Sequence, residues 1–247
     1  MTRIDRAVQR RVSESLSSAA PDVPVVGEEA DARKDVPDAG LAWVVDPIDG
    51  TNNYVAGGVV WAVAVAATRD GDPVAAVTHL PVIGETYTVG AVSDAAERAD
   101  ASITEFDGDA EASPVARRNG EPIHVSDADE PSSFTVNPIF GFSDRHRRRH
   151  RRAVETIFET FGDYRRVGCA QAALAAVASG ELEVAVSTVR LNPWDTVGGA
   201  RLIRAAGGRV TDVHGDRWVP GATGVVATNG TAHDRVVEAL DGDSTHR

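Results

Sequence analysis

Residues 45–51 read Val-Asp-Pro-Ile-Asp-Gly-Thr, and this stretch decides how the rest of the sequence is interpreted. An apolar run at 41–45 ends abruptly at Asp46, which is the pattern of a buried strand that stops at a polar edge. Pro47 fixes a turn there, and the spacing brings Asp49 back toward the side that Asp46 occupies. The stretch therefore predicts two converging carboxylates at a strand end.

The two residues that follow predict a place for an anion beside these carboxylates. Gly50 allows the backbone to approach a ligand closely, and Thr51 begins what we expect to be a short helix with free N–H groups at its start. Two carboxylates would repel a phosphate unless a hard divalent cation neutralised them and shared the phosphate oxygens. A pair of aspartates that only stabilises a turn is the alternative, because Asp-Gly is common in turns.

Further acids follow apolar stretches elsewhere in the sequence. Glu28 and Glu29 lie in a turn after the apolar run at 23–26, and Asp195 follows Trp194 at the start of an expected helix. Each alone is typical of a helix cap or a surface acid. Together with Asp46 and Asp49 they are candidates for one shared site.

Hydrophobic periodicity predicts helices and strands that alternate more in the second half than in the first. The first expected helix, 5–20, would place Ile4, Val8 and Val12 on one face. The other expected helices cover 143–162 (N-capped by Ser143), 168–180, 192–208 and 232–240. Strands are expected at 23–29, 41–47, 59–68, 75–80, 86–89, 122–126, 133–140, 182–188, 208–212 and 224–229, with a loop at 93–121. This order predicts an α+β or α/β protein of two subdomains, 1–130 and 131–247.

Composition narrows the classes of partner and compartment. The 247 residues carry a formal charge of −12, so we expect no binding to nucleic acid or to anionic membranes. The longest apolar run, 59–67, is far shorter than the roughly 20 residues that span a bilayer. The one cysteine, Cys169, lies in an apolar helical segment and is interpreted as a packed thiol in a reducing, cytoplasmic compartment. Acid excess with a single lysine, Lys34, suits a halophilic protein, although genomic base composition could produce the same bias.

A dense basic cluster occupies residues 145–152, at the start of the helix expected over 143–162. A solvated basic face is one interpretation, because most charge runs are of that kind. A docking surface for an anionic partner or a second subunit is the other.

Two segments resemble the signature segments of the inositol monophosphatase family, the magnesium-dependent, lithium-sensitive sugar phosphatases. They are WVVDPIDGTNNY at 43–54 and NPWDTVGGARLIRAAGGRVTD at 192–212. Weaker matches follow the family order: MTRIDRAVQ, VVGEE, THLPVIGETYTVG, ARRNGEPIHVS, RRVGCAQAALAAVASG and VVATNGTAHDRVVEAL. The resemblance covers almost the whole chain and implies a layered αβαβα sugar-phosphatase sandwich.

The resemblance also implies a role for individual residues. Two or three Mg²⁺ ions per site would be held by Glu28, Asp46, the Ile48 carbonyl, Asp49 and Asp195, with Asp46 bridging two of them. The substrate phosphate would be bound by Gly50, Thr51 and Asp49. Asp5 would accept a hydrogen bond from the Thr51 hydroxyl, and this pair would help to deprotonate the attacking water, with Glu28 nearby.

The activity implied is hydrolysis of a small sugar or polyol phosphate, such as inositol monophosphate or fructose 1,6-bisphosphate, by metal-activated water in a homodimer. The alternatives are a 3'-phosphoadenosine 5'-phosphate type of nucleotide phosphatase and a noncatalytic phosphate-binding or interaction protein on the same fold. A binding module would not need the pair of Asp5 and Thr51.

Three departures from the family pattern bear on the substrate and the assembly. Family members usually carry a further helix ahead of the segment that contains Asp5. No acid lies between Glu183 and Asp195, where inositol-selective enzymes place a ring-binding glutamate. Arg190 in that interval could instead meet a second phosphate, or be an exposed arginine at a strand end. The Pro usual after the Asp-Gly-Thr loop is also missing, from which we expect only local differences.

Overall fold

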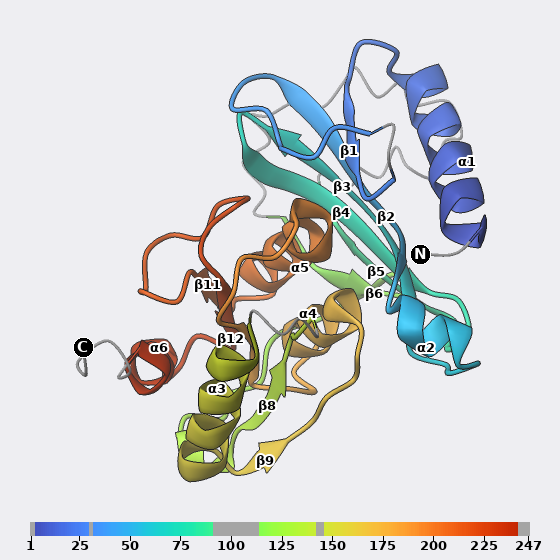
Figure 1. Ribbon diagram of the computed structural model, residues 1–247. Coiled ribbons are helices and arrows are strands. Elements are labelled where there is room, and N and C mark those ends of the chain that lie inside the picture. Colours follow the sequence, from blue (N-terminus) through green and yellow to red (C-terminus); the bar gives the residue numbers. More distant parts are fainter. Residues whose placement is uncertain (1–2, 30–31, 91–113, 142–145, 242–247) are drawn as a thin grey trace.

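The structure is a computed structural model that describes residues 3–29, 32–90, 114–141 and 146–241. Two sheets alternate with helices in five layers, with α1 outermost on one side and α3 and α6 on the other (Figure 1). The layered αβαβα arrangement predicted above is confirmed. Within the described residues, no helix is long and apolar enough to cross a lipid bilayer.

The first sheet is a meander of seven strands in sequence order. All neighbours pair antiparallel except the first two, which run parallel. The expected antiparallel strands are therefore present, and an additional short hairpin forms where a loop was expected. The strands are β1 (Val25–Gly27), β2 (Leu41–Asp49), β3 (Ala62–Arg69), β4 (Asp72–Leu80), β5 (Glu85–Val89), β6 (Arg117–Arg118) and β7 (Glu121–Pro122).

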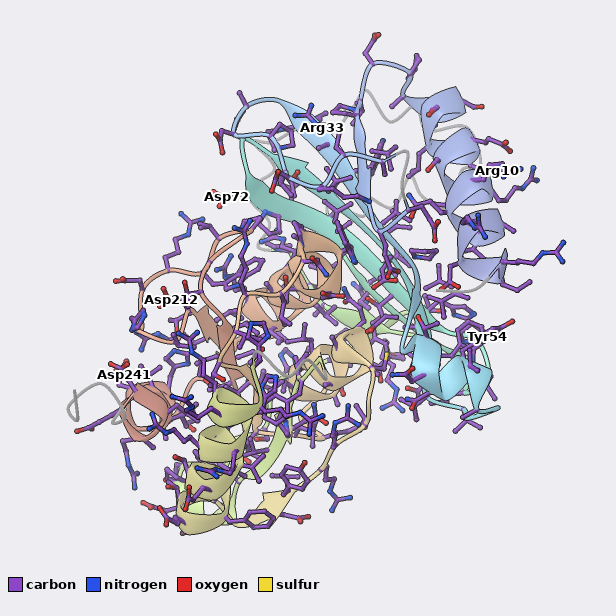
Figure 2. The ribbon with its side chains drawn as sticks, in the orientation of Figure 1. Arg10, Arg33, Tyr54, Asp72, Asp212 and Asp241 are labelled. Atoms are coloured by element: carbon purple, nitrogen blue, oxygen red, sulfur yellow. The ribbon has the colours of Figure 1, made fainter. Side chains whose placement is uncertain are left out.

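Helix α1 (Arg3–Ala19) covers the outer face of this sheet and contacts β2. Its length agrees with the prediction, but the expected apolar face is present only in part, because Val8 and Val12 are half-buried and Ile4 is exposed. Asp5 and Gln9 are its buried residues, whereas Ile4 is 46% exposed. The Gln9 amide lies so close to Gly27 that a Cβ there would approach its Nε2 to 2.5 Å, so a polar side chain takes the inward position. Arg10 lies on the outward side (Figure 2).

The second sheet has five strands in the order β11-β12-β10-β8-β9. β8 pairs parallel with both of its neighbours, and the β10–β12–β11 part is antiparallel. The expected strand at 122–126 is wrong beyond Pro122, because residues 123–126 run outside both sheets. The strands are β8 (Thr135–Pro138), β9 (Asp163–Tyr164), β10 (Val184–Ser187), β11 (Arg209–Thr211) and β12 (Val225–Thr228).

Helices α3 (Arg147–Thr160) and α6 (His233–Asp241) cover the outer face of the second sheet. The arginines of the basic cluster within α3 are exposed, but His150 is buried and its ring lies 4.2 Å from that of Phe140. The cluster is therefore not a uniform solvated face. The N-cap expected at Ser143 and most of the loop expected at 93–121 lie outside the described residues.

Helices α4 (Ala170–Ala178) and α5 (Pro193–Ala205) form the middle layer, packed against both sheets (Figure 1). Their mutual packing is close, because a Cβ at Gly199 would lie 2.4 Å from a Leu174 methyl group. β10 shows how the two cores divide: Ala185 faces the larger cluster around α4 and α5, whereas Val184 and Val186 belong to the smaller cluster below α3 and α6. A strand buried on both faces has this pattern.

Candidate active site

A β-bulge in β2 brings the first two aspartates together. Asp46 lies opposite Ala64 of β3, but Asp49 lies opposite Ala62, so β2 carries one extra residue between them. Residues three apart in a regular strand point to opposite faces, and one inserted residue reverses that relation. The Ile48 N–H donates to Asp46 Oδ1 at 3.1 Å within the bulge. The convergence predicted from the sequence is present, although a bulge in a continuous strand produces it rather than a turn.

The third aspartate arrives from the start of α5. Asn192 is the N-cap of this helix, Pro193 follows it, and Asp195 completes a capping box by accepting the Asn192 N–H at 3.1 Å through Oδ2. One carboxylate oxygen each of Asp46, Asp49 and Asp195 lies within 4.8 Å of the others. The N-cap is therefore Asn192 and not Asp195, which supports the cap from the third helical position and lies close to the other two aspartates.

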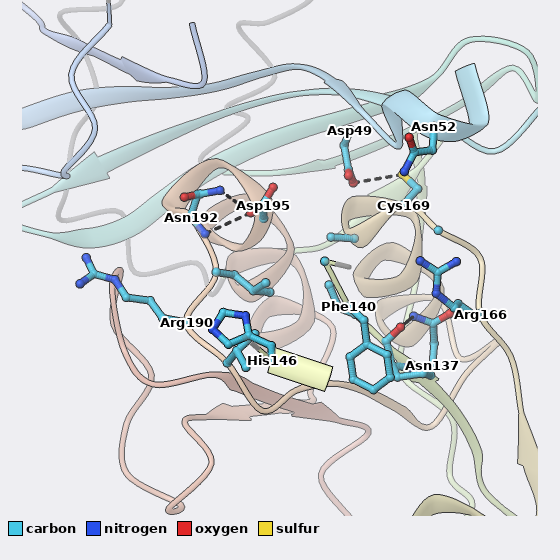
Figure 3. A pocket seen from close by; sticks show the side chains of 17 residues that line it. Asp49, Asn52, Asn137, Phe140, His146, Arg166, Cys169, Arg190, Asn192 and Asp195 are labelled. Atoms are coloured by element: carbon cyan, nitrogen blue, oxygen red, sulfur yellow. Dashed lines mark hydrogen bonds between the residues drawn. The ribbon is translucent and has the colours of Figure 1, made fainter. Parts of the chain in front are cut away.

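The N-terminus of α4 holds one oxygen of Asp49. Its Oδ2 accepts the Gln171 N–H at 2.5 Å. It also accepts the Cys169 thiol at 3.1 Å (Figure 3). The Gln171 side chain in turn donates to the carbonyl of Trp194 at 2.7 Å, which ties α4 to the start of α5. Burial and Asp49 raise the pKa of Cys169, so the thiol is a protonated donor, in agreement with its interpretation as a packed residue.

Burial, with repulsion added at Asp46 and Asp195, disfavours the charged forms of the three aspartates. Burial raises the pKa of Asp46 well above its ordinary value, and the charges of Asp49 and Asp195 raise it further. Burial also raises the pKa of Asp49, against the opposing hydrogen bonds from α4. Asp195 reaches a pKa of about 7, through burial first and the charge of Asp49 second. Buried carboxylates that raise one another's pKa in this way lack a compensating positive charge.

The turn after β1 places the charge of Glu28 where it acts on the same aspartates. Burial raises the pKa of Glu28, and the charges of Asp5, Glu29 and Asp49 raise it further. Glu28 is outside the group within 4.8 Å, yet its charge raises the pKa values of Asp46 and Asp195. Acids from four separate segments therefore face one region.

The phosphate-loop candidates follow directly after the bulge. Gly50 has a left-handed φ of +83°, and a Cβ there would lie 3.1 Å from the Cβ of Cys169 and 3.2 Å from the Val60 carbonyl oxygen. α2 (Thr51–Val55) begins at the next residue. The Thr51 hydroxyl donates to the Ile48 carbonyl at 3.0 Å. Its hydrogen bond to Asp5 stays a prediction; Asp5 itself is fully buried in α1.

A cavity of about 410 Å³ opens beside Asp49 and Asp195, between α2, the start of α4 and the segment before α5 (Figure 3). Arg190 lines it, but the guanidinium points away from Asp49 and lies 3.6 Å from the Asp35 carboxylate. Sequence reasoning missed several polar lining residues, which carry no motif and come from separate segments: Asn52, Asn137, His146, Arg166 and Asn192.

These residues fit a hard divalent cation. Buried carboxylate oxygens within reach of one ion are the ligands that Mg²⁺ and similar ions prefer, and a positive charge would relieve the repulsion that raises their pKa values. The start of α2 beside them leaves backbone N–H groups of its first turn for an anion. Fold and site together define a phosphoester hydrolase of the metal-dependent class.

Comparisons with known proteins give the family. The model of the inositol monophosphatase family matches residues 1–244. An inositol-1-monophosphatase of Mycolicibacterium smegmatis is 31% identical over 97% of this chain and 79% of its own length. A fructose-1,6-bisphosphatase/inositol-1-monophosphatase of Thermotoga maritima is 27% identical over 98% of this chain and 82% of its own. A solved inositol monophosphatase from Anabaena superposes with a TM-score of 0.81 at 27% identity, covering 96% of this chain and 86% of that structure.

The chain therefore belongs to the inositol monophosphatase family, and it is a phosphoric monoester hydrolase. The resemblance predicted from the two signature segments is confirmed.

Proposed function

We propose that this protein hydrolyses a small sugar or polyol phosphate with Mg²⁺ as its cofactor. The observation that carries the proposal is the group of Asp46, Asp49 and Asp195 beside a cavity large enough for a sugar phosphate. The names of two relatives, an inositol-1-monophosphatase and a fructose-1,6-bisphosphatase/inositol-1-monophosphatase, support this substrate class.

Two or three Mg²⁺ ions, when bound, would offset the charge of the phosphate and lower the pKa of a water molecule. Their proposed ligands are Glu28, Asp46, the Ile48 carbonyl, Asp49 and Asp195. Asp49 is already oriented for this role, because the Gln171 N–H and the Cys169 thiol hold its Oδ2. The N-terminal capping box orients Asp195 in the same manner.

The chain's own residues would then bind the phosphate and move the proton. Gly50 and Thr51 would hold phosphate oxygens through backbone N–H groups at the start of α2. Asp5 would accept the Thr51 hydroxyl proton, so that the hydroxyl oxygen can receive a proton from the attacking water, with Glu28 beside it. The electrostatic coupling of Glu28 to Asp5 supports their common placement.

The substrate within this class depends on the cavity. Its basic lining residues, Arg166 and Arg190, favour a substrate with a second phosphate over an unsubstituted inositol ring. Arg190 would have to leave its exposed pair with Asp35, which exposed ion pairs permit at little cost.

Phosphate release from a panel of substrates tests the proposal directly. Inositol 1-phosphate, fructose 1,6-bisphosphate and 3'-phosphoadenosine 5'-phosphate are assayed with Mg²⁺ and with a chelator, at low and high salt. We expect Mg²⁺-dependent hydrolysis of a sugar or polyol phosphate. Hydrolysis of the nucleotide alone, or binding of all three without turnover, would contradict the proposal.

The remaining assignments rest on the sequence. We infer a cytoplasmic protein adapted to high salt, because the chain is acidic, has one cysteine and contains one lysine. The homodimer is inferred from the family resemblance alone. The division into subdomains 1–130 and 131–247 is supported by the two sheets, whose strands lie before residue 123 and after residue 134.

A further inference from the structure

The ammonium group of Lys34 lies at the focus of three consecutive backbone carbonyls. Its Nζ donates to the carbonyl oxygens of Gly27, Glu28 and Glu29 at 2.8, 2.7 and 2.6 Å. An ammonium has three N–H donors and no acceptor, so these contacts use its full donor capacity. A surface lysine that only interacts with solvent would not be arranged in this way.

Lysine suits this position, and arginine does not. Lys34 is the only lysine of the chain, and every other basic side chain apart from histidine is an arginine. The planar guanidinium directs its donors outward in a fork, whereas the ammonium is a point charge on a flexible stem that can sit between three oxygens. The contact with three carbonyl oxygens therefore depends on lysine, a residue type that occurs once in the sequence.

A second contact joins the same ammonium to the start of α5. Nζ lies 5.3 Å from the ring centroid of Trp194, a distance at which a cation and an indole ring attract each other. Trp194 is only 7% exposed and immediately precedes Asp195. Lys34 thus connects the turn that carries Glu28 with the helix start that carries Asp195.

Repulsion among the acids explains why a contact between these two segments matters. The charge of Glu28 adds to the pKa values of Asp46 and Asp195, which burial raises first. The pKa of Glu28 is raised by burial and then by the charges of Asp5, Glu29 and Asp49. Like charges tend to push the Glu28 turn away from the aspartates. Three charge-assisted hydrogen bonds to the backbone of the turn oppose that movement without neutralising the Glu28 carboxylate, which remains available as a ligand.

We propose that Lys34 is a positioning residue: it fixes the backbone of residues 27–29, against Trp194, in the position from which Glu28 can reach a metal ion shared with the three aspartates. The inference rests on the proposed metal-dependent function. Residues that orient metal ligands typically contribute 10–100-fold to metal affinity or activity. Lys34 acts through Glu28, without touching substrate.

The first test measures metal binding without substrate. Calorimetric titration with Mg²⁺ compares the wild type with Lys34→Met, and with Arg33→Met as the matched control, because Arg33 is the neighbouring exposed cation (Figure 2). We expect the affinity for Mg²⁺ to fall about tenfold in Lys34→Met and to stay within twofold in Arg33→Met. Equal affinity in Lys34→Met and the wild type would overturn the proposal.

Chemical rescue distinguishes the effect of losing the ammonium group from an effect of the substitution on folding. Lys34→Cys is treated with 2-bromoethylamine, whose bromide is displaced by the thiolate to give a side chain close to lysine in length and charge. Cys169 is 3% exposed, so we expect it to stay unmodified. Wild-type protein treated with the same reagent is the control for this. Recovery of Mg²⁺ affinity to within about twofold of the wild type supports the proposal. If the alkylated Lys34→Cys protein binds Mg²⁺ as weakly as the untreated one, the proposal is contradicted.

The wild type alone supplies a third readout, which holds even if the variants fold poorly. Lysine labelled with ¹⁵N gives one ammonium signal, because the chain has one lysine. We expect slow hydrogen exchange and a change of chemical shift when Mg²⁺ binds. A rapidly exchanging signal that Mg²⁺ leaves unchanged would refute the role of Lys34. Failure of the wild type to bind Mg²⁺ and to hydrolyse any ester would instead refute the proposed function.

Discussion

Replacing Asp195 by Asn should stabilise the metal-free protein while it abolishes turnover. The pKa of Asp195 rises from 3.8 to about 7 in the folded chain, because burial and then Asp49 disfavour its charge. A pKa difference of this size corresponds to about 4 kcal/mol at 25 °C. The sign follows from linkage: between pH 3.8 and 7 folding takes up a proton at Asp195, so the wild type loses stability as the pH rises through that interval.

The asparagine side chain removes this penalty but weakens the helix cap. Its carbonyl oxygen can still accept the Asn192 N–H, and the loss of charge on that bond costs about 1 kcal/mol. The net gain at pH 8 is therefore about 3 kcal/mol, which corresponds to an increase in Tm of roughly 6–12 °C for a chain of this size. Below pH 4 the two proteins should have nearly equal stability.

Thermal unfolding in chelator from pH 4 to 8 measures the difference between the wild type and Asp195→Asn. Asp163→Asn is the matched control, because hydrogen bonds to the Tyr164 N–H and to Arg165 lower the pKa of this exposed acid and reverse the expected sign. Added Mg²⁺ should raise the Tm of the wild type and leave that of Asp195→Asn unchanged. An Asp195→Asn protein that is less stable than the wild type at pH 8 in chelator would show that burial and Asp49 do not disfavour the charge of Asp195.

Three further substitutions and modifications test the neighbouring residues. Thr51→Ala should lower turnover at least about a hundredfold, as expected for a group that moves a proton, but lower the free energy of unfolding by only about 1 kcal/mol, since one hydrogen bond to Ile48 is lost; normal turnover would exclude its catalytic role. Gly50→Ala should lose more stability in urea than Gly57→Ala: both have positive φ and share a strain of about 1–2 kcal/mol, but only Gly50 is crowded. Cys169 should react with a disulfide reagent only after unfolding, because burial raises its pKa and only 3% of it is exposed; fast reaction of the folded protein would contradict this.

The sequence was sufficient for the first five strands of the first sheet and for the aspartates. Alternation of apolar residues and turn signals defines an antiparallel meander, because each strand is followed by its neighbour in space. Asp46, Asp49 and Asp195 lie at positions where strand and helix patterns end, so local reasoning can find them. The local structure that brings Asp46 and Asp49 together nevertheless differs from the prediction. A bulge in β2 has no sequence pattern that distinguishes it from a turn at Pro47.

Long-range contacts explain what the sequence could not supply. Ile4 was expected on the buried face of α1, but the position of Gln9 depends on Gly27, a residue in another element. Lys34 likewise appears in the sequence as one charged residue of a surface loop. Its importance arises only because the turn of residues 27–29 folds back over its side chain and Trp194 approaches from the other half of the chain.

The placement of the aspartates implies that the fold tolerates a local instability for the sake of metal binding. Asp49 receives several donors, among them the Gln171 N–H and the Cys169 thiol, and Asp195 receives the N–H and the side-chain amide of Asn192. Asp46 is 3% exposed and receives the Ile48 N–H. Fully satisfying these carboxylates with protein donors would lower their pKa values and stabilise the apo chain, but would occupy the oxygens that a cation needs. Partial satisfaction orients each carboxylate and still leaves its pKa raised. A divalent ion that binds the folded chain alone returns the lost stability by mass action, so its binding energy derives in part from repulsion already present in the metal-free site.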